Sequence, residues 1–221
     1  MEETLKATLQ PIDYADFARL HGLEVATVRA VCEVEAAGSG FLEDGRPKIL
    51  FEGHVFWKQL KKYGVDPAPY AAQDRYGSVL YARWTRKHYK GGAGEYDRLA
   101  LAREIHEDAA LCSASWGLFQ IMGYHYDRLG YESVREFVRL HEESARGHLE
   151  AFGRFLEAYN LDGLLRRNEW ARFAERYNGP GYRENRYDVK LADAYRKFKQ
   201  QEEVVAVDRD LDQPTGTVPT A

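Results

Sequence analysis

The chain has 221 residues, a length that suits one domain with or without a short appendage. Hydrophobic residues make up 44% and charged residues 30%, the balance of a globular protein, and the net charge of −4 gives no reason to expect a nucleic-acid partner. The opening MEETLKATLQ lacks the basic and apolar regions of an export signal, and no run reaches the roughly 18 apolar residues of a membrane span, so we expect synthesis in the cytoplasm.

The first half of the chain predicts short helices separated by turns, with one strand. In order, these are a helix through ADFARL capped by Asp13, a helix from Leu23 to Glu35 stopped by Gly38 and Gly40, a turn in EDGRP (43–47), a strand in KILFE (48–52) and a helix through VFWKQLKKY ended by Gly64. Residues 65–94 lack a clean period and contain GVDPAP and KGGAG, which predicts a long surface excursion rather than a second domain.

The second half of the chain predicts longer helices. They are a helix over 95–112, an amphipathic helix from Ser133 to about Tyr159, a helix capped by Asn168 and ended at YNGPGY, and a last helix that packs through Tyr187, Leu191, Ala194 or Tyr195, and Phe198. Residues 200–221 lose aromatic residues and gain Asp, Pro and Thr. We therefore expect a single α+β, predominantly helical domain over 1–199 and a flexible C-terminal tail over 200–221.

Two glutamates end the second predicted helix, and only one of them lies on its apolar side. Residues three, four and seven apart share a helix face, so Val28, Val31 and Glu35 form one stripe. Glu33 follows Arg29 by four residues, the spacing of an exposed ion pair. Helical spacing therefore places Glu33 in solvent and carries Glu35 toward the interior.

A carboxylate at the position of Glu35 is costly unless it is paired or protonated. The C-terminal end of a helix also disfavours negative charge, so both effects raise the pKa of the side chain. A raised pKa is what a general acid needs to hold a proton near neutral pH. The helix alone fits equally well a structural glutamate that is bonded to backbone amides.

Three motifs in chain order carry a family resemblance. VEAAGSGF is followed by SWGLFQIMG and RYNGPGY, and the longer runs GRPKILFEGHVF, AALCSASWGLFQIMG and YNGPGYRENRYDVKLADAY surround them. Together they resemble the N-acetylmuramidase domain of phage endolysins, within the lysozyme superfamily and close to goose-type lysozymes and lytic transglycosylases. The resemblance covers about residues 10–198 and implies a lysozyme-like fold with a small β-hairpin region. One departure is Ala36, where relatives often carry Ser directly after the catalytic Glu.

The resemblance implies a bacteriolytic glycosidase. Its expected substrate is the peptidoglycan glycan strand, cut at the β-1,4 bond between N-acetylmuramic acid and N-acetylglucosamine, with Glu35 as the general acid. Goose-type relatives need no covalent nucleophile, which implies inversion. Two alternatives stay open: a lytic transglycosylase, which would use the same Glu35 to form 1,6-anhydromuramic ends, and a non-catalytic wall-binding module, which Ala36 slightly favours.

A second carboxylate that activates water has three candidates near the predicted turn and strand, namely Glu43, Asp44 and Glu52. Glu52 belongs to the family-like ILFEGH and is our choice for a catalytic role, although a structural pairing with His54 or an arginine explains it as well. Asp44 is typical of a turn residue in Asp-Gly.

The other two motifs are expected to build the substrate-binding site. Gln120 offers amide donors and an acceptor to sugar groups, or else bridges the backbone of a tight turn. Ser115 is expected to bond within that turn or to face the cleft. Tyr177 and Asn178 end a helix just before Gly179, which would let them project into the cleft, whereas a core Tyr and a capping Asn are the structural alternative.

Metals, cofactors and further partners gain little support from the sequence. His141 and His148 lie seven residues apart without a third ligand, so we expect no metal and no cofactor. The segment RWTRKHYK (83–90) is either a solvated loop face or a binding site for anionic wall polymer. The resemblance implies a monomer that is made in the host bacterial cytoplasm and acts on the wall after release, with a holin as a possible partner for access.

Deleting residues 202–221 is expected to leave wall lysis and the melting temperature nearly unchanged, because this segment has little apolar material to bury. A turbidity assay and thermal unfolding of the shortened chain check this. A large loss of either quantity would show that the segment docks on the domain or on the substrate.

Overall fold

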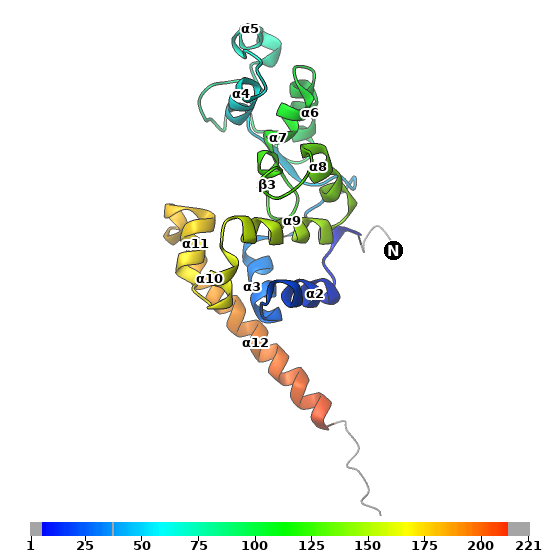
Figure 1. Ribbon diagram of the computed structural model, residues 1–221, viewed down its shortest axis with the longest axis vertical. Coiled ribbons are helices and arrows are strands. Elements are labelled where there is room, and N and C mark those ends of the chain that lie inside the picture. Colours follow the sequence, from blue (N-terminus) through cyan, green and yellow to red (C-terminus); the bar gives the residue numbers. More distant parts are fainter. Residues whose placement is uncertain (1–5, 37, 212–221) are drawn as a thin grey trace, which may run out of the picture. The chain divides into compact units, whose positions relative to one another are not determined.

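The computed structural model describes residues 6–36 and 38–211, which form two compact units (Figure 1). The first unit consists of Met1–Asp13 and Ala36–Asn160, and the second of Tyr14–Glu35 and Leu161–Ala221, each within the described residues. Among these residues, no helix combines the length and the apolar character needed to cross a bilayer. The last ten residues of the predicted tail, 212–221, lie outside the described part of the chain.

The first unit is mainly helical and holds the sheet. Its elements are β1 (Ile49–Phe51), α4 (Gly53–Lys62), α5 (Ala68–Ala71), η1 (Asp74–Tyr76), α6 (Gly94–Arg103), α7 (Glu107–Cys112), β2 (Ala114–Trp116), β3 (Ile121–Met122), η2 (Gly123–His125), α8 (Val134–Glu143) and α9 (Ala145–Ala158). This content confirms the predicted α+β, predominantly helical fold class.

The sheet is small and antiparallel, in the order β1-β2-β3. The predicted strand in KILFE is confirmed, but its partner is β2, with Leu50 opposite Ser115, rather than a segment across the nearby turn. The turn in EDGRP is confirmed, with Gly45 at a φ of 80° and a single bridge between Phe41 and Pro47. The sheet therefore joins the family-like ILFEGH to the SWGLFQIMG motif.

A buried ion pair fastens the excursion over 65–94 to strand β1. Glu95 and Arg98 are almost fully buried and lie 2.7 Å apart. One Glu95 oxygen accepts the N–H of Phe51, and the other accepts the N–H groups of Lys90 and Gly91. Arg98 donates to the carbonyl oxygens of Phe51 and Ser78, so it links strand β1 to the excursion as well. The excursion is thus tied to the backbone directly before Glu52.

The second unit is built around its last helix. Most of α2 (Pro11–His21) belongs to it, together with α3 (Val25–Glu35), α10 (Asp162–Arg166), α11 (Trp170–Asn178), η3 (Pro180–Arg183) and α12 (Tyr187–Leu211). Helix α12 packs against α3 and α11. Its Ala194 and Phe198 form an apolar cluster with Ala26 and Ala30 of α3, which confirms the predicted packing face.

Several predicted boundaries were wrong. The helix expected over 95–112 ends at Arg103 and restarts after His106, whose side chain caps α7. The long helix expected from Ser133 to Tyr159 is two helices, divided at Ser144, which has an extended backbone and caps α9 through Gly147. Asn168 is not the cap of α11, because it has a φ of 53° and Glu169 takes that position.

The last helix is longer than predicted. Helix α12 continues through Leu211, so residues 200–211, assigned to a flexible tail, are helical in the structure. The proposed division at residue 199 stays a prediction, but it falls inside a continuous helix.

Candidate active site

Glu35 is the last residue of α3, directly after a buried stripe. Val28 and Val31 are 3% and 1% exposed, which confirms the predicted phase of this helix. The Glu35 side chain is half-buried, whereas Glu33 is exposed. The partner expected for Glu33 was wrong, because its carboxylate pairs with Lys197 at 2.6 Å, while Arg29 stacks on the ring of Phe198.

The two oxygens of Glu35 have different surroundings. Oε2 accepts a hydrogen bond of 2.8 Å from Nδ2 of Asn178, which lies in the same unit. Oε1 is buried and accepts no hydrogen bond from any described residue. The hydrogen bond from Asn178 thus fixes the direction of Oε2, and Oε1 remains available to carry a proton.

Burial raises the pKa of Glu35 above its ordinary value of 4.5, because a partly desolvated carboxyl group favours its neutral form. The Asn178 hydrogen bond and the positive charge of Lys190 act in the opposite direction, and burial outweighs both. This agrees with the direction expected from the sequence. Lys190 was missed because it lies 155 positions further along the chain, in the first turn of another helix, where no local pattern marks it.

Tyr177 and Asn178 reach Glu35 because they end helix α11. Tyr177 stacks on Phe173, one turn earlier, with ring centroids 5.4 Å apart. Gly179 follows at a φ of 85°, a left-handed conformation that favours glycine and ends the helix after Asn178. Burial raises the pKa of Tyr177, and the nearby charge of Glu35 adds to the effect. The structure therefore brings Glu35, Tyr177 and Asn178 together in one unit.

Removing the amide of Asn178 is expected to move the alkaline limb of activity. The Asn178 hydrogen bond lowers the pKa of Glu35, so Asn178→Ala should raise that pKa further and keep the acid protonated to higher pH. The measurement is the rate of wall lysis against pH for both proteins. An alkaline limb that stays in place or moves to lower pH would show that this hydrogen bond does not tune the acid.

Glu52 precedes α4 in the first unit, and each of its carboxylate oxygens has a close polar neighbour. Its Oε1 accepts a hydrogen bond of 2.6 Å from the hydroxyl of Tyr89, and its Oε2 lies 3.2 Å from Nδ1 of His54. Its side chain is 14% exposed. The pairing with His54 was foreseen as the structural alternative, whereas Tyr89 was missed, since it lies 37 residues away in an irregular segment.

Gly53, directly after Glu52, is needed for close packing. Its N–H donates to the hydroxyl of Tyr81, and a Cβ atom at this position would lie only 2.4 Å from the Tyr81 ring. The excursion therefore contacts Glu52 through Tyr89 and Gly53 through Tyr81.

The other two carboxylate candidates are turn residues. Glu43 and Asp44 are exposed, and Asp44 forms an ion pair of 2.6 Å with Arg46. Hydrogen bonds from Arg46 lower the pKa of Asp44. Among the three candidates, only Glu52 is shielded from solvent.

Ser115 and Gln120 hold a turn between strands. Gln120 is exposed and has a φ of 49°. Its amide donates to the carbonyl oxygens of Gly117 and Lys48, and its Oε1 accepts a hydrogen bond of 2.7 Å from Ser115. The structure thus shows the turn-bridging role for both residues, and their contact with sugar stays a prediction.

His141 and His148, the two histidines considered as metal ligands, form hydrogen bonds inside the first unit. His141 and His148 are buried, and His148 accepts from the N–H of Leu118 through Nδ1 and contacts the carbonyl of His141 through Nε2. Burial lowers the pKa of His148 to about 4, which keeps the ring neutral at pH 7. The described residues contain no cluster of three or more His, Cys, Asp or Glu that fits a metal ion.

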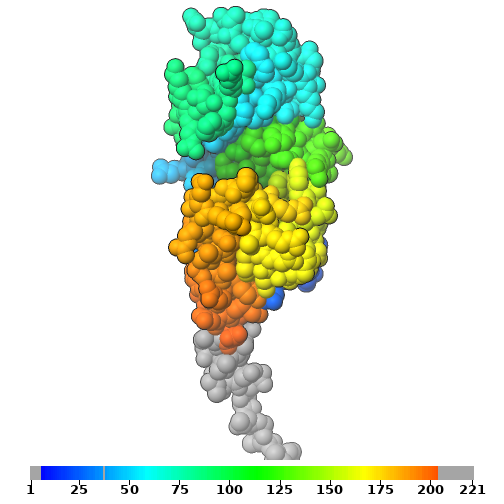
Figure 2. All heavy atoms as spheres, turned by 90° about the vertical axis from the view of Figure 1, so that its left-hand side faces the viewer, coloured from blue at the N-terminus to red at the C-terminus, as the bar shows by residue number. Residues whose placement is uncertain are grey.

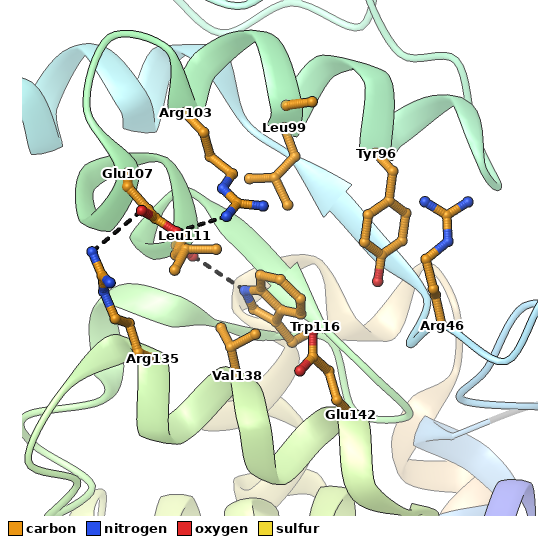
Figure 3. Close-up of a pocket in the computed structure, with 11 residues that line it drawn as sticks. Arg46, Tyr96, Leu99, Arg103, Glu107, Leu111, Trp116, Arg135, Val138 and Glu142 are labelled. Atoms are coloured by element: carbon orange, nitrogen blue, oxygen red, sulfur yellow. Dashed lines mark hydrogen bonds and ion pairs between the residues drawn. The ribbon is translucent and has the colours of Figure 1, made fainter.

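A separate pocket of about 440 Å³ lies in the first unit (Figure 3). Leu99, Leu111, Trp116 and Val138 contribute its apolar lining. The arginines that line it have acidic partners: Arg103 and Arg135 pair with Glu107, Arg135 also pairs with Asp108, and Arg46 pairs with Asp44. None of the predicted site residues lines this pocket, so it is not the candidate active site.

Comparisons with known proteins identify the family of this chain. A family model described as Muramidase, N-acetylmuramidase, matches residues 24–199, which include Glu35, Glu52, Tyr177 and Asn178. The crystal structure of the Burkholderia AP3 phage endolysin is similar, with 43% sequence identity and a TM-score of 0.82 over 88% of this chain and 73% of that one. Comparison with curated proteins gave no match. The chain therefore belongs to the N-acetylmuramidase family, the glycoside hydrolases that act on peptidoglycan.

Proposed function

We propose that this protein is an endolysin-type muramidase that uses Glu35 as its general acid. The bond it cuts is the β-1,4 linkage from N-acetylmuramic acid to N-acetylglucosamine. The observation that carries the proposal is the state of the Glu35 carboxyl group: burial raises its pKa, Asn178 fixes one oxygen, and the other is buried without a hydrogen bond from the described residues.

The proposed reaction begins with proton transfer from Glu35 to the glycosidic oxygen. The C1–O bond of N-acetylmuramic acid then breaks, and the N-acetylglucosamine chain leaves with a neutral hydroxyl group. A water oxygen bonds to C1 and gives its proton to a base, which leaves a reducing muramic end. Tyr177 supports the geometry by packing beside Glu35, where its hydroxyl is kept neutral.

Glu52 is the proposed base for the attacking water. It is the shielded carboxylate among the three candidates; a hydrogen bond from Tyr89 orients its Oε1, and Nδ1 of His54 lies 3.2 Å from its Oε2. A base that activates water, without a covalent nucleophile, leads to inversion at C1.

Access to the wall and the working state of the protein are further parts of the proposal. The similarity to a phage endolysin supports synthesis in the host bacterial cytoplasm and action on peptidoglycan after release. A holin would then provide the route across the membrane, and the protein would act as a monomer.

Mass spectrometry of digested peptidoglycan tests the reaction type. We expect products with reducing muramic ends, because water is the proposed acceptor. Products lighter by one water, with a 1,6-anhydro ring, would overturn hydrolysis and establish a lytic transglycosylase. Purified walls that bind the protein but release nothing would establish a wall-binding module.

A further inference from the structure

Residues 75–94 form a cationic segment within a chain of net charge −4. The segment contains no Asp or Glu and carries Arg75, Arg83, Arg86, Lys87 and Lys90. In Figure 2 its cyan-to-green spheres lie at the surface of the first unit. A block of one charge sign on a surface attracts a partner of the opposite sign.

Three of these cations have no acidic partner among the described residues. Arg75 pairs with Glu104, and Lys90 lies 3.6 Å from Asp97. Arg83, Arg86 and Lys87 are exposed and pair with no acidic side chain among the described residues.

Trp84 stands among these free cations. It is 57% exposed, whereas Trp116 is 1% exposed. The guanidinium of Arg86 lies 5.5 Å from the centre of the Trp84 ring. An exposed indole beside cations offers a partner a large, rigid apolar face next to positive charge.

The Trp84 ring lies near Tyr89, a residue that contacts the candidate carboxylate. Trp84 affects the pKa of Tyr89, whose hydroxyl donates to Glu52 at 2.6 Å. The exposed part of the Trp84 ring offers an apolar face.

We propose that Trp84, Arg83, Arg86 and Lys87, here the Trp84 surface, bind the glycan strand of peptidoglycan. The C–H face of a pyranose ring covers an indole well, and the peptide stems of the strand, together with lactyl groups that carry no stem, present carboxylates that match the free cations. This inference rests on the proposed function, because the strand it binds is the proposed substrate.

An anionic membrane is a weaker match to the Trp84 surface. Basic segments that bind lipid usually carry about four to eight Lys or Arg, or form an amphipathic helix. The Trp84 surface has three free cations, and residues 77–93 contain no helix. The position of Trp84 near Tyr89, which donates to Glu52, also favours a partner that the candidate active site handles.

The test measures binding of the full chain to purified, insoluble peptidoglycan in the Glu35→Gln background, so that no strand is cut. Adding Trp84→Ala should raise the apparent Kd by about tenfold, the usual scale for truncating a central aromatic contact. Trp84→Phe should lose less, because it keeps an apolar ring. Arg83→Gln with Arg86→Gln should weaken binding and reduce its dependence on salt.

The matched control is Arg139→Gln with Arg154→Gln. It changes the net charge by the same amount at the exposed Arg139 of α8 and the half-buried Arg154 of α9, and should leave binding unchanged. Thermal melting identifies any variant that fails to fold. Quenching of Trp fluorescence by soluble glycan fragments, lost in the folded Trp84→Phe, provides a second readout.

Unchanged binding of folded Trp84→Ala and Arg83→Gln/Arg86→Gln would overturn the proposal. Binding to phosphatidylglycerol vesicles that these variants lose, with wall binding intact, would assign the surface to lipid instead. Because the assay measures binding without turnover, its outcome is independent of whether the wild-type protein hydrolyses or merely binds the wall.

Discussion

Replacing Glu35 with Gln is expected to lower wall lysis by at least about a hundredfold. Gln keeps the shape of the side chain and its contact with Asn178, but it has no proton to transfer, and general acid catalysis typically contributes about 10²–10⁴-fold. Clearing of purified walls at matched protein concentrations measures the loss.

The same variant should fold at least as stably as the wild type at neutral pH. The pKa of Glu35 is higher in the folded protein than its ordinary value of 4.5, so its contribution to stability is lost as pH rises from that value through the folded pKa. Gln does not titrate and removes this penalty, which thermal melting at pH 7 checks.

Glu33→Gln is the matched control, two residues earlier on the same helix. It removes only the exposed pair with Lys197 and should keep nearly full activity. If Glu33→Gln were inactive and Glu35→Gln still cleared walls, the assignment of the acid would be wrong.

Glu95→Ala is expected to lower the free energy of unfolding by about 3–5 kcal/mol, the usual cost of removing one partner of a buried ion pair. The change leaves the buried Arg98 guanidinium without its carboxylate and three backbone N–H groups, those of Phe51, Lys90 and Gly91, without their acceptor. Urea unfolding of both proteins measures the difference.

Glu143→Ala provides the comparison, because it breaks an exposed pair with Arg139 on α8. Such a pair contributes about 0–1 kcal/mol, so the two variants should differ clearly. If they cost the same, the Glu95–Arg98 pair does not anchor the excursion.

The pH dependence of Glu95 differs in sign from that of Glu35. Burial acts to raise the pKa of Glu95, but its backbone hydrogen bonds and Arg98 outweigh burial, so the pKa falls below 4.5. Its contribution to stability is therefore present above that pH and is lost as pH falls through the folded pKa.

Local sequence patterns predicted the elements that carry the two proposed catalytic carboxylates. The spacing of Val28, Val31 and Glu35 set the helix phase correctly, because a buried stripe follows the helical period whatever packs against it. The apolar run at 48–52 and the glycine at 64 likewise placed β1 and the end of α4.

Interactions between distant segments were beyond these patterns. Tyr89 reaches Glu52, and Lys197 reaches Glu33, across 37 and 164 positions, where only the folded chain decides the pairing. The break at Ser144 had a visible signal, a Ser that can cap a helix, but the helical residues on both sides concealed it.

The role of Glu35 as proton donor is tested most directly by a titration of its carboxyl group, followed by carbon-13 NMR and assigned by the signal that Glu35→Gln lacks. We expect a pKa above 4.5, a higher pKa in Asn178→Ala, and an alkaline limb of wall lysis that follows both values. A Glu35 carboxyl group that titrates at or below 4.5, or a lytic rate that does not change over the pH range of its titration, would contradict the role of Glu35 as the proton donor.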